Sequence, residues 1–159
     1  MQERAGYSRL QIGLHWLIAV LILGNWFLGD GMGQAVRENK IGATGAPGNW
    51  HVWIGVTVLV LVLLRFAVRL LRGAPVPPGQ PGSLAVRVAG WGHAALYILM
   101  IGVPLGGALV WYQGITSLGD IHGLAGNVLF FLALGHALMA LYHHYLLKDG
   151  VVARMMRPE

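Results

Sequence analysis

Histidines inside an apolar segment are the first feature of this chain that could carry chemistry. Residues 121–145 are apolar enough to cross a bilayer, yet they contain His122, His136, His143 and His144. Ionisable side chains at membrane depth are costly and usually functional. Fourteen residues separate His122 from His136, so the two imidazoles share one helical face, about 21 Å apart along the axis. This separation suits two stacked metal sites and is too long for one shared metal.

The composition is that of a membrane protein. Of the 159 residues, 56% are hydrophobic and only 11% are charged, and the length allows about four spans of roughly 20 residues each. The chain has no cysteine, which excludes disulfides, cysteine-ligated iron–sulfur clusters and the covalent attachment of c-type haem. Any haem would therefore be bound non-covalently, with histidine as the obvious ligand.

Four apolar stretches predict an all-α, four-helix transmembrane bundle that forms a single membrane domain over residues 1–159. The first stretch lacks a clear cleavage site after it and is interpreted as a retained span rather than a signal peptide. A Pro- and Gly-rich linker, residues 73–82, separates the second from the third, and Pro104 is expected to kink the third. The expected spans are 11–29, 51–71, 87–111 and 121–145.

Lysine and arginine are distributed unevenly between the two sides of the predicted bundle. Nine lie in the N-terminal segment, in the second loop with its flanks and in the C-terminal tail, whereas the first and third loops hold two, Arg37 and Lys40. The positive-inside rule therefore predicts that both termini are cytoplasmic. This asymmetry also accounts for the net charge of +5, so we expect no nucleic-acid partner.

The predicted orientation gives each histidine a depth. His51 and His122 fall at the outer level, and His15 and His136 fall at the inner level. Each pair comes from two helices, so each pair could hold one haem iron from both sides, an arrangement that favours electron transfer over oxygen binding. By geometry alone, His93 lies at nearly the depth of His15 and is a rival partner for His136.

Simpler explanations exist for several of these residues. His143 and His144 lie at the cytoplasmic boundary, where both could simply be solvated. The arginines are expected as topology anchors, although some could contact haem propionates. Gly55 and Gly126 follow the outer histidines by four residues and leave room for a flat macrocycle, but glycine is frequent in membrane helices anyway. The haem interpretation therefore rests on the combination of four histidines and two depths.

Three stretches resemble the bacterial cytochrome b561 family, in particular its superoxide oxidase type. They are residues 7–19 (YSRLQIGLHWLIA), 121–128 (IHGLAGNV) and 135–159 (GHALMALYHHYLLKDGVVARMMRPE). The resemblance covers nearly the whole chain and implies a four-helix bundle of the inner membrane with two b haems. It favours His15 over His93 as a ligand, and the haem-iron ligands that it implies are His15, His51, His122 and His136.

The resemblance also implies that superoxide reduces the outer haem and that the inner haem reduces ubiquinone near the cytoplasmic surface. The quinone is expected around His143, the candidate catalytic residue, because imidazole titrates near neutral pH and can relay protons. Lys148, Arg9 and His93 are the candidate neighbours that would contact the quinone or a haem propionate.

The predicted outer loops differ from those of the superoxide oxidase type. Loop 112–120 is markedly shorter, and Arg37 and Lys40 are outnumbered by Asp30, Glu38 and Asp120, which makes a poor funnel for an anion.

Two other functions stay open. The first is a non-catalytic electron-transfer subunit for a periplasmic dehydrogenase, hydrogenase or c-type cytochrome. The second is a histidine-lined metal transporter or sensor, which would be colourless and would need carboxylates in the spans; the sequence has none at mid-membrane depth.

Overall fold

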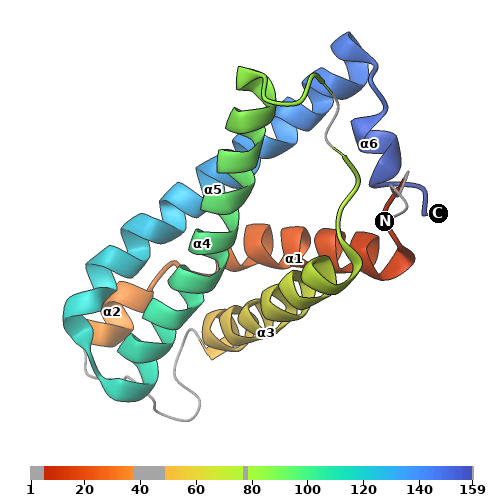
Figure 1. The fold of residues 1–159 in the computed structure, drawn as a ribbon. Helices are drawn as coiled ribbons and strands as arrows, with labels where there is room; N and C mark the ends of the chain where they lie inside the picture. The colour runs from red at the N-terminus through yellow and green to blue at the C-terminus, as the bar shows by residue number, and fades with distance from the viewer. Residues whose placement is uncertain (1–5, 38–48, 77–78, 159) are drawn as a thin grey trace.

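The chain folds into a bundle of four long helices (Figure 1). The computed structural model describes residues 6–37, 49–76 and 79–158, and within these ranges it contains no strand. All four long helices are apolar and long enough to cross a membrane, which confirms the predicted all-α membrane bundle. They are α1 (Arg9–Phe27), α3 (Asn49–Arg72), α4 (Leu84–Gln113) and α5 (Gly119–Tyr142). The short elements are α2 (Met32–Arg37), η1 (Thr116–Leu118), η2 (His143–Leu147) and α6 (Val151–Arg154).

The long helices pack in chain order. Helix α1 packs against α3, α3 against α4 and α4 against α5, and α1 also contacts α5, which closes the bundle. At the end of the chain, the indole N–H of Trp16 in α1 donates a hydrogen bond to the carbonyl of Met155, at 2.9 Å, just after α6. The C-terminal tail is therefore attached to the first helix.

The apolar core of the bundle is small. Leu14 and Ile18 of α1 pack with Val58, Val62 and Val68 of α3, and Val62 is fully buried. Most other large apolar side chains of the described helices are partly or largely exposed. A surface of this kind is unfavourable in water but is well solvated by lipid acyl chains. The outer surface of the bundle is therefore its lipid-contacting surface.

Two side chains fix the beginning of α1 and attach it to the end of α3. The hydroxyl of Ser8 accepts a hydrogen bond from the backbone N–H of Gln11 at 3.4 Å, and the Gln11 side chain accepts one from the N–H of Ser8 at 3.1 Å. This reciprocal arrangement is a capping box. The buried Gln11 also donates from Nε2 to the carbonyl of Gly73 at 2.9 Å, so one residue both caps α1 and joins it to α3.

Helix α4 is longer than the span expected from hydropathy. It begins at Leu84 because the Ser83 hydroxyl accepts a hydrogen bond from the backbone N–H of Val86, a standard N-cap. The helix continues through Pro104 and ends at Gln113, where Gly114 adopts the left-handed conformation with φ of 67°. The expected loop between the first two spans contains the short helix α2, which its glycine content did not indicate.

The fourth span ends differently from the expectation. The α-helix stops at Tyr142, and the chain continues as a single π-helical turn, η2, before Lys148 adopts a left-handed conformation with φ of 52°. Turns of this kind are rare and occur frequently at functional sites. The turn contains His143 and His144, so the helical register changes at the histidines that end the span.

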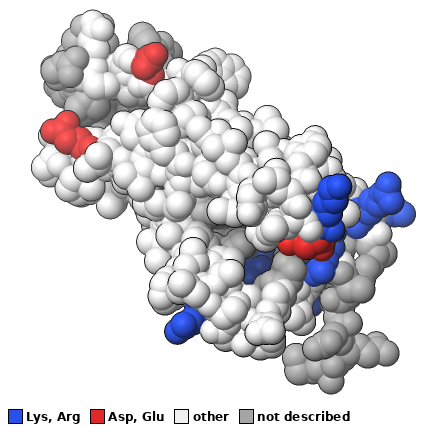
Figure 2. All heavy atoms as spheres, turned by 90° about the horizontal axis from the view of Figure 1, so that it is seen from above, with Lys and Arg blue, Asp and Glu red and all other residues white. Residues whose placement is uncertain are grey.

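Charged side chains are segregated along the bundle. In Figure 2 most Lys and Arg atoms lie toward one end of the molecule, and two acidic groups lie at the other end. This separation is the one on which the predicted cytoplasmic location of the termini rests, and that orientation stays a prediction. Lys40 and Glu38 lie outside the described residues.

Replacing Gln11 with Ala is expected to lower the stability of the bundle by about 1–2 kcal/mol, because the change removes half of the cap and the bond to Gly73. The thermal midpoint of the purified protein in detergent measures this loss. Gln113→Ala is the matched control, since Gln113 is exposed at the end of α4. Equal midpoints for the two variants would contradict the role given to Gln11.

Candidate functional site

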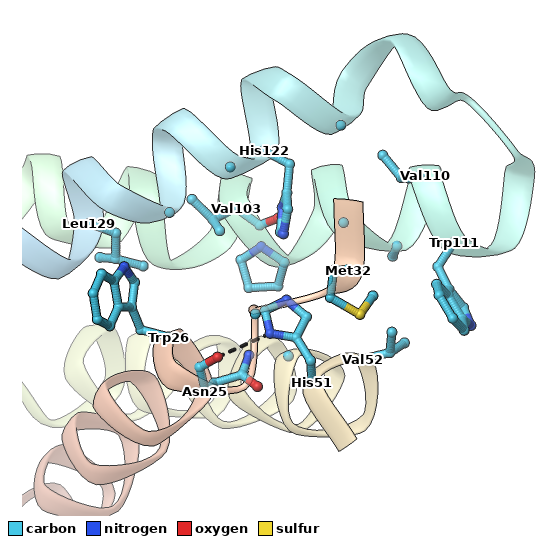
Figure 3. A pocket seen from close by; sticks show the side chains of 18 of the residues that line it. Asn25, Trp26, Met32, His51, Val52, Val103, Val110, Trp111, His122 and Leu129 are labelled. Carbon is cyan, nitrogen blue, oxygen red and sulfur yellow. Dashed lines mark hydrogen bonds between the residues drawn. The ribbon is translucent and has the colours of Figure 1, made fainter. Parts of the chain in front are cut away.

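At one end of the bundle, His51 of α3 faces His122 of α5 across a cavity (Figure 3). The ring centroids are 5.9 Å apart, and the two rings are nearly perpendicular at 88°. The cavity has a volume of about 800 Å³ and is lined by residues near the C-terminal ends of α1 and α4 and the N-terminal ends of α3 and α5. Its size and its largely apolar lining are typical of pockets that hold organic cofactors.

A helix end fixes the orientation of His51. Its Nδ1 lies 3.0 Å from the carbonyl oxygen of Asn25 (Figure 3), two residues before α1 ends at Phe27. The last carbonyls of a helix have no partner within the helix. Because a carbonyl only accepts, Nδ1 must carry the proton and donate it. The lone pair of Nε2 is therefore available to a metal.

His122 is held in the same way by a different helix. Its Nδ1 lies 2.9 Å from the carbonyl oxygen of Val103 in α4, so this imidazole also donates from Nδ1 and keeps the Nε2 lone pair. Metal-binding histidines generally donate their second N–H to a carboxylate or a backbone carbonyl, which sets the tautomer and the ring orientation. Both outer imidazoles meet this condition.

Three glycines and one asparagine determine the space around the outer pair. Gly55 and Gly126, expected from the sequence to leave room beside the histidines, both line the cavity. Gly107 was not expected: a Cβ atom there would stand 2.7 Å from Cε1 of His122, closer than real contacts allow. Asn25 was also missed, and its buried Oδ1 has no hydrogen-bond partner among the described residues.

At the inner level, imidazoles from three helices meet. The rings of His15 in α1 and His136 in α5 have centroids 6.3 Å apart at an angle of 77°. Helix α5 also contacts α4, and the ring centroid of His93 in α4 lies 5.2 Å from that of His136. Nδ1 of His93 donates to the carbonyl of Ala89, one turn earlier in α4, at 2.7 Å. The described residues give neither His15 nor His136 a hydrogen bond of this kind.

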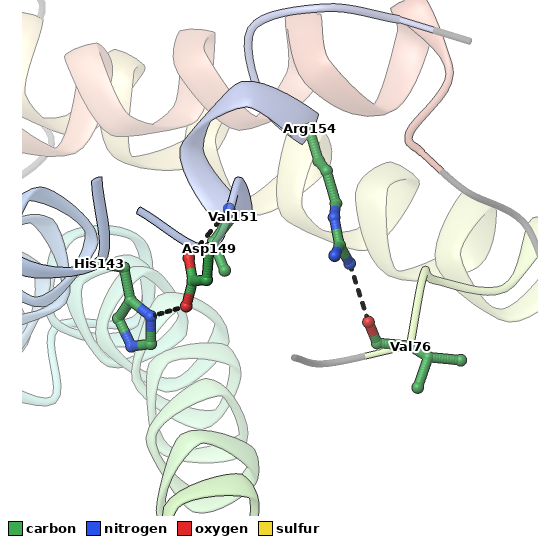
Figure 4. Close-up of polar contacts among 5 residues, drawn as sticks. All are labelled: Val76, His143, Asp149, Val151 and Arg154. Carbon is green, nitrogen blue, oxygen red and sulfur yellow. Dashed lines mark hydrogen bonds and ion pairs between the residues drawn. The ribbon is translucent and has the colours of Figure 1, made fainter. Parts of the chain in front are cut away.

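A third group of polar residues lies just beyond the inner level. His143 donates from Nδ1 to Oδ2 of Asp149, and Oδ1 of Asp149 accepts the backbone N–H of Val151 at 3.2 Å (Figure 4). Burial acts to raise the pKa of Asp149, but the hydrogen bonds from His143 and Val151 outweigh it and hold that pKa below its ordinary value. Asp149 is therefore ionised at neutral pH and orients the imidazole.

The other residues expected near a quinone are arranged differently. Arg9 and Lys148 are exposed, and neither forms a hydrogen bond or an ion pair within the described residues. The structure thus joins His143 to Asp149 and not to Arg9, Lys148 or His93. Sequence reasoning missed Asp149. Its position directly after Lys148, where the last span ends, could have identified it, but hydropathy analysis treats this segment only as a loop.

No set of three or more His, Asp or Glu side chains converges on a possible metal position in the part of the chain that the structure describes. At the outer level two imidazoles face each other, and at the inner level His136 lies near both His15 and His93. Two facing imidazoles suit a metal that already carries four equatorial ligands.

Comparison with known proteins identifies the family. Residues 6–158 match the family model described as prokaryotic cytochrome b561. Cytochrome b562 of Cereibacter sphaeroides is 42% identical, over 99% of both chains. A probable superoxide oxidase, CybB, of Yersinia pestis is 31% identical, over 94% of this chain and 95% of its own. Cytochrome b561 homolog 1 of Escherichia coli is 29% identical, over 94% of this chain and 96% of its own.

The match spans all four membrane helices and both ends of the described chain. Cytochromes of the b type contain haem b, which has no covalent bond to the protein, in agreement with the lack of cysteine. The chain therefore belongs to the prokaryotic cytochrome b561 family and is a multi-pass electron-transfer protein of the bacterial inner membrane.

Proposed function

We propose that this protein is a dihaem cytochrome that moves single electrons between the outer face of the membrane and the ubiquinone pool. His51 and His122 hold the outer haem, and His15 and His136 hold the inner haem. The observation that carries the proposal is that the histidines form two pairs, each from two helices, at two levels of one bundle.

The ring separations support this assignment. An imidazole nitrogen bound to a first-row metal lies about 2 Å from it, and the ring centroid lies about 1 Å further, so two axial imidazoles on one iron have centroids about 6 Å apart. The separations of 5.9 Å at the outer level and 6.3 Å at the inner level agree with this value. The His93–His136 separation of 5.2 Å is shorter, which favours His15 over His93.

The outer cavity supports a flat, mostly apolar cofactor between the two rings. Its lining includes Gly55, Gly107 and Gly126 on three different helices, so backbone rather than side chains faces part of the space. Haem supplies one-electron chemistry when it is bound there. His51 and His122 each present a free Nε2 lone pair, and a haem iron held between them would have no position left for oxygen.

The inner end supports reduction of a quinone. Reducing ubiquinone to ubiquinol takes two electrons and two protons, so two superoxide ions, one ubiquinone and two protons give two oxygen molecules and one ubiquinol. His143 lies at the boundary, with Asp149 accepting from its Nδ1, which leaves Nε2 free to pass a proton. The relative named as a probable superoxide oxidase makes superoxide the first candidate donor.

One observation favours a second function, that of an electron-transfer subunit with a protein donor. Asp30 and Asp120 both line the outer cavity, and two carboxylates in its lining repel an anion such as superoxide. A redox protein with a basic docking face, such as a c-type cytochrome, would meet complementary charge there. The 42% identical relative is named only as a cytochrome.

The purified protein is expected to contain two haems b per chain, both low-spin. His51→Ala or His122→Ala should remove the outer haem alone, because each variant deprives the outer haem iron of one of its two histidine ligands. His15→Ala or His136→Ala should remove the inner haem alone, and His93→Ala should retain both. Haem content by pyridine haemochrome assay and reduced-minus-oxidised spectra measure these outcomes. Loss of a haem in the His93 variant, with retention in the His15 variant, would reverse the inner assignment.

Gly107→Ala is expected to perturb the outer haem, because the added methyl group collides with the imidazole of His122. The hydrogen bond from His122 to Val103 limits how far that ring can turn away. Electron paramagnetic resonance should reveal a changed axial geometry in one of the two haems. Gly106→Ala is the control, since a Cβ at Gly106 meets no atom within 4 Å. Identical spectra for the two variants would contradict the role of Gly107.

Superoxide generated beside the purified protein should drive steady reduction of a ubiquinone analogue. His143→Ala should leave the haem spectra unchanged and slow ubiquinol formation roughly 10²-fold or more, the usual contribution of a proton-transfer group. Its neighbour His144 is exposed, so His144→Ala is the matched control. Absence of superoxide-driven turnover in a protein with both haems would favour the electron-transfer subunit. Unchanged turnover in His143→Ala would exclude this residue from proton transfer.

A further inference from the structure

Arg65 of α3 occupies the position where a second ligand would be expected on that helix. Fourteen residues separate His51 from Arg65, the same spacing that separates His122 from His136 on α5. Because this spacing is close to four helical turns, Arg65 lies on the same face of α3 as His51, about 21 Å further along the axis. The inner level therefore receives an imidazole from α5 and a guanidinium from α3.

The contacts of Arg65 agree with this placement. Its side chain is half-buried, and its Nη1 donates a hydrogen bond at 2.7 Å to the carbonyl of Gln11 in α1, one turn before His15. The guanidinium is close enough to both His15 and His136 to interact electrostatically with each. The positive charge of Arg65 therefore lies near the inner pair, where its side chain reaches from α3 to α1.

This charge has no negative partner in the part of the chain that the structure describes. The carboxylates there are Asp30 and Asp120 at the outer cavity and Asp149, which is bonded to His143. A guanidinium has five N–H donors in a planar fork, and Arg65 forms a hydrogen bond with Gln11 through one of its nitrogens. A half-buried cation between membrane helices is costly unless an anion neutralises it. The remaining donors therefore point to an anion that arrives with the cofactor.

We propose that Arg65 binds a propionate carboxylate of the inner haem and thereby favours the reduced state of that haem. The proposal rests on the inner haem of the proposed function. Arginine suits a carboxylate because its fork donates two parallel hydrogen bonds. Its positive charge also stabilises an electron added nearby, since Coulomb interactions are strong where water is scarce. Arg65 is a positioning and charge-tuning residue, and it holds electrons at the level from which ubiquinone is reduced.

Potentiometric titration of the purified holoprotein tests the proposal. The wild type should titrate as two one-electron waves. In Arg65→Gln one wave should move to lower potential, with a roughly tenfold smaller equilibrium constant for reduction, which corresponds to about 59 mV. The other wave should not move. Arg65→Lys keeps the charge and should retain most of the potential. Arg72→Gln is the control, because Arg72 is exposed and lies about 10 Å further along α3.

Resonance Raman spectra of the same samples report on the contact itself, because the propionate bending band responds to hydrogen bonding of the carboxylate. This band should shift in Arg65→Gln and stay unchanged in Arg72→Gln. If Arg65→Gln fails to accumulate, the Raman band of Arg65→Lys still decides: it should shift, since a lysine cannot reproduce the paired hydrogen bonds of the arginine fork. Two waves and a Raman band identical to wild type in the Arg65 variants would overturn the proposal. A wild type with only one haem wave would instead overturn the dihaem assignment on which it rests.

Discussion

The outer site depends on a hydrogen bond from an imidazole to a backbone carbonyl of a neighbouring helix. In lipid a polar group without a partner is costly, so a histidine with two nitrogens must either satisfy both or offer one to a ligand. His51 uses the carbonyl of Asn25 and His122 uses that of Val103. In each case Nδ1 is satisfied and Nε2 is left over, so the protonation state that suits a metal ligand follows from the fold alone.

This constraint also explains where the outer histidines lie relative to the helix ends. Helix α1 stops at Phe27, so the carbonyl of Asn25 is free to accept at the level where α3 begins with Asn49 and Trp50. Had α1 continued for another turn, Asn25 would have bonded within its own helix. The length of α1 therefore determines the orientation of the His51 side chain on α3. The C-terminal end of α1 and the N-terminal end of α3 must lie at the same depth.

Sequence patterns predicted the elements of this fold and the depth of its histidines. Hydropathy identifies four spans because each must match the thickness of the bilayer, and the fourteen-residue spacing of His122 and His136 follows from helix geometry. The hydrogen-bond partners were not predictable in this way. Asn25 and Val103 act through contacts that exist only after helices pack, and Asp149 reaches His143 through an irregular turn that hydropathy does not reveal. Gly107 was missed because its role depends on packing: α5 places the imidazole of His122 where a Cβ atom at residue 107 would stand.

The two levels of the bundle differ in their electrostatics, and in the proposed function this difference would favour one direction of electron transfer. At the outer level the cavity is lined by Asp30 and Asp120, and negative charge there would disfavour the reduced state of a bound haem. At the inner level Arg65 lies near His15 and His136, and positive charge there would favour the reduced state of a bound haem. An arginine that the positive-inside rule would count as a topology anchor would therefore, in the proposed function, also bias electrons toward the inner level.

In the proposed function, the end of α5 would supply protons at the level where the electrons arrive. A continued α-helix would carry His143 and His144 around at the regular 100° per residue, whereas the π-helical turn widens the helix and Lys148 in the left-handed region turns the chain sharply. That turn returns Asp149 to His143, six residues earlier, and the N–H of Val151 holds its second oxygen. An ionised carboxylate fixed in this way keeps Nδ1 protonated, so only Nε2 exchanges protons. The irregular turn thus gives His143 a fixed hydrogen-bond partner, whereas its neighbour His144 is exposed to solvent.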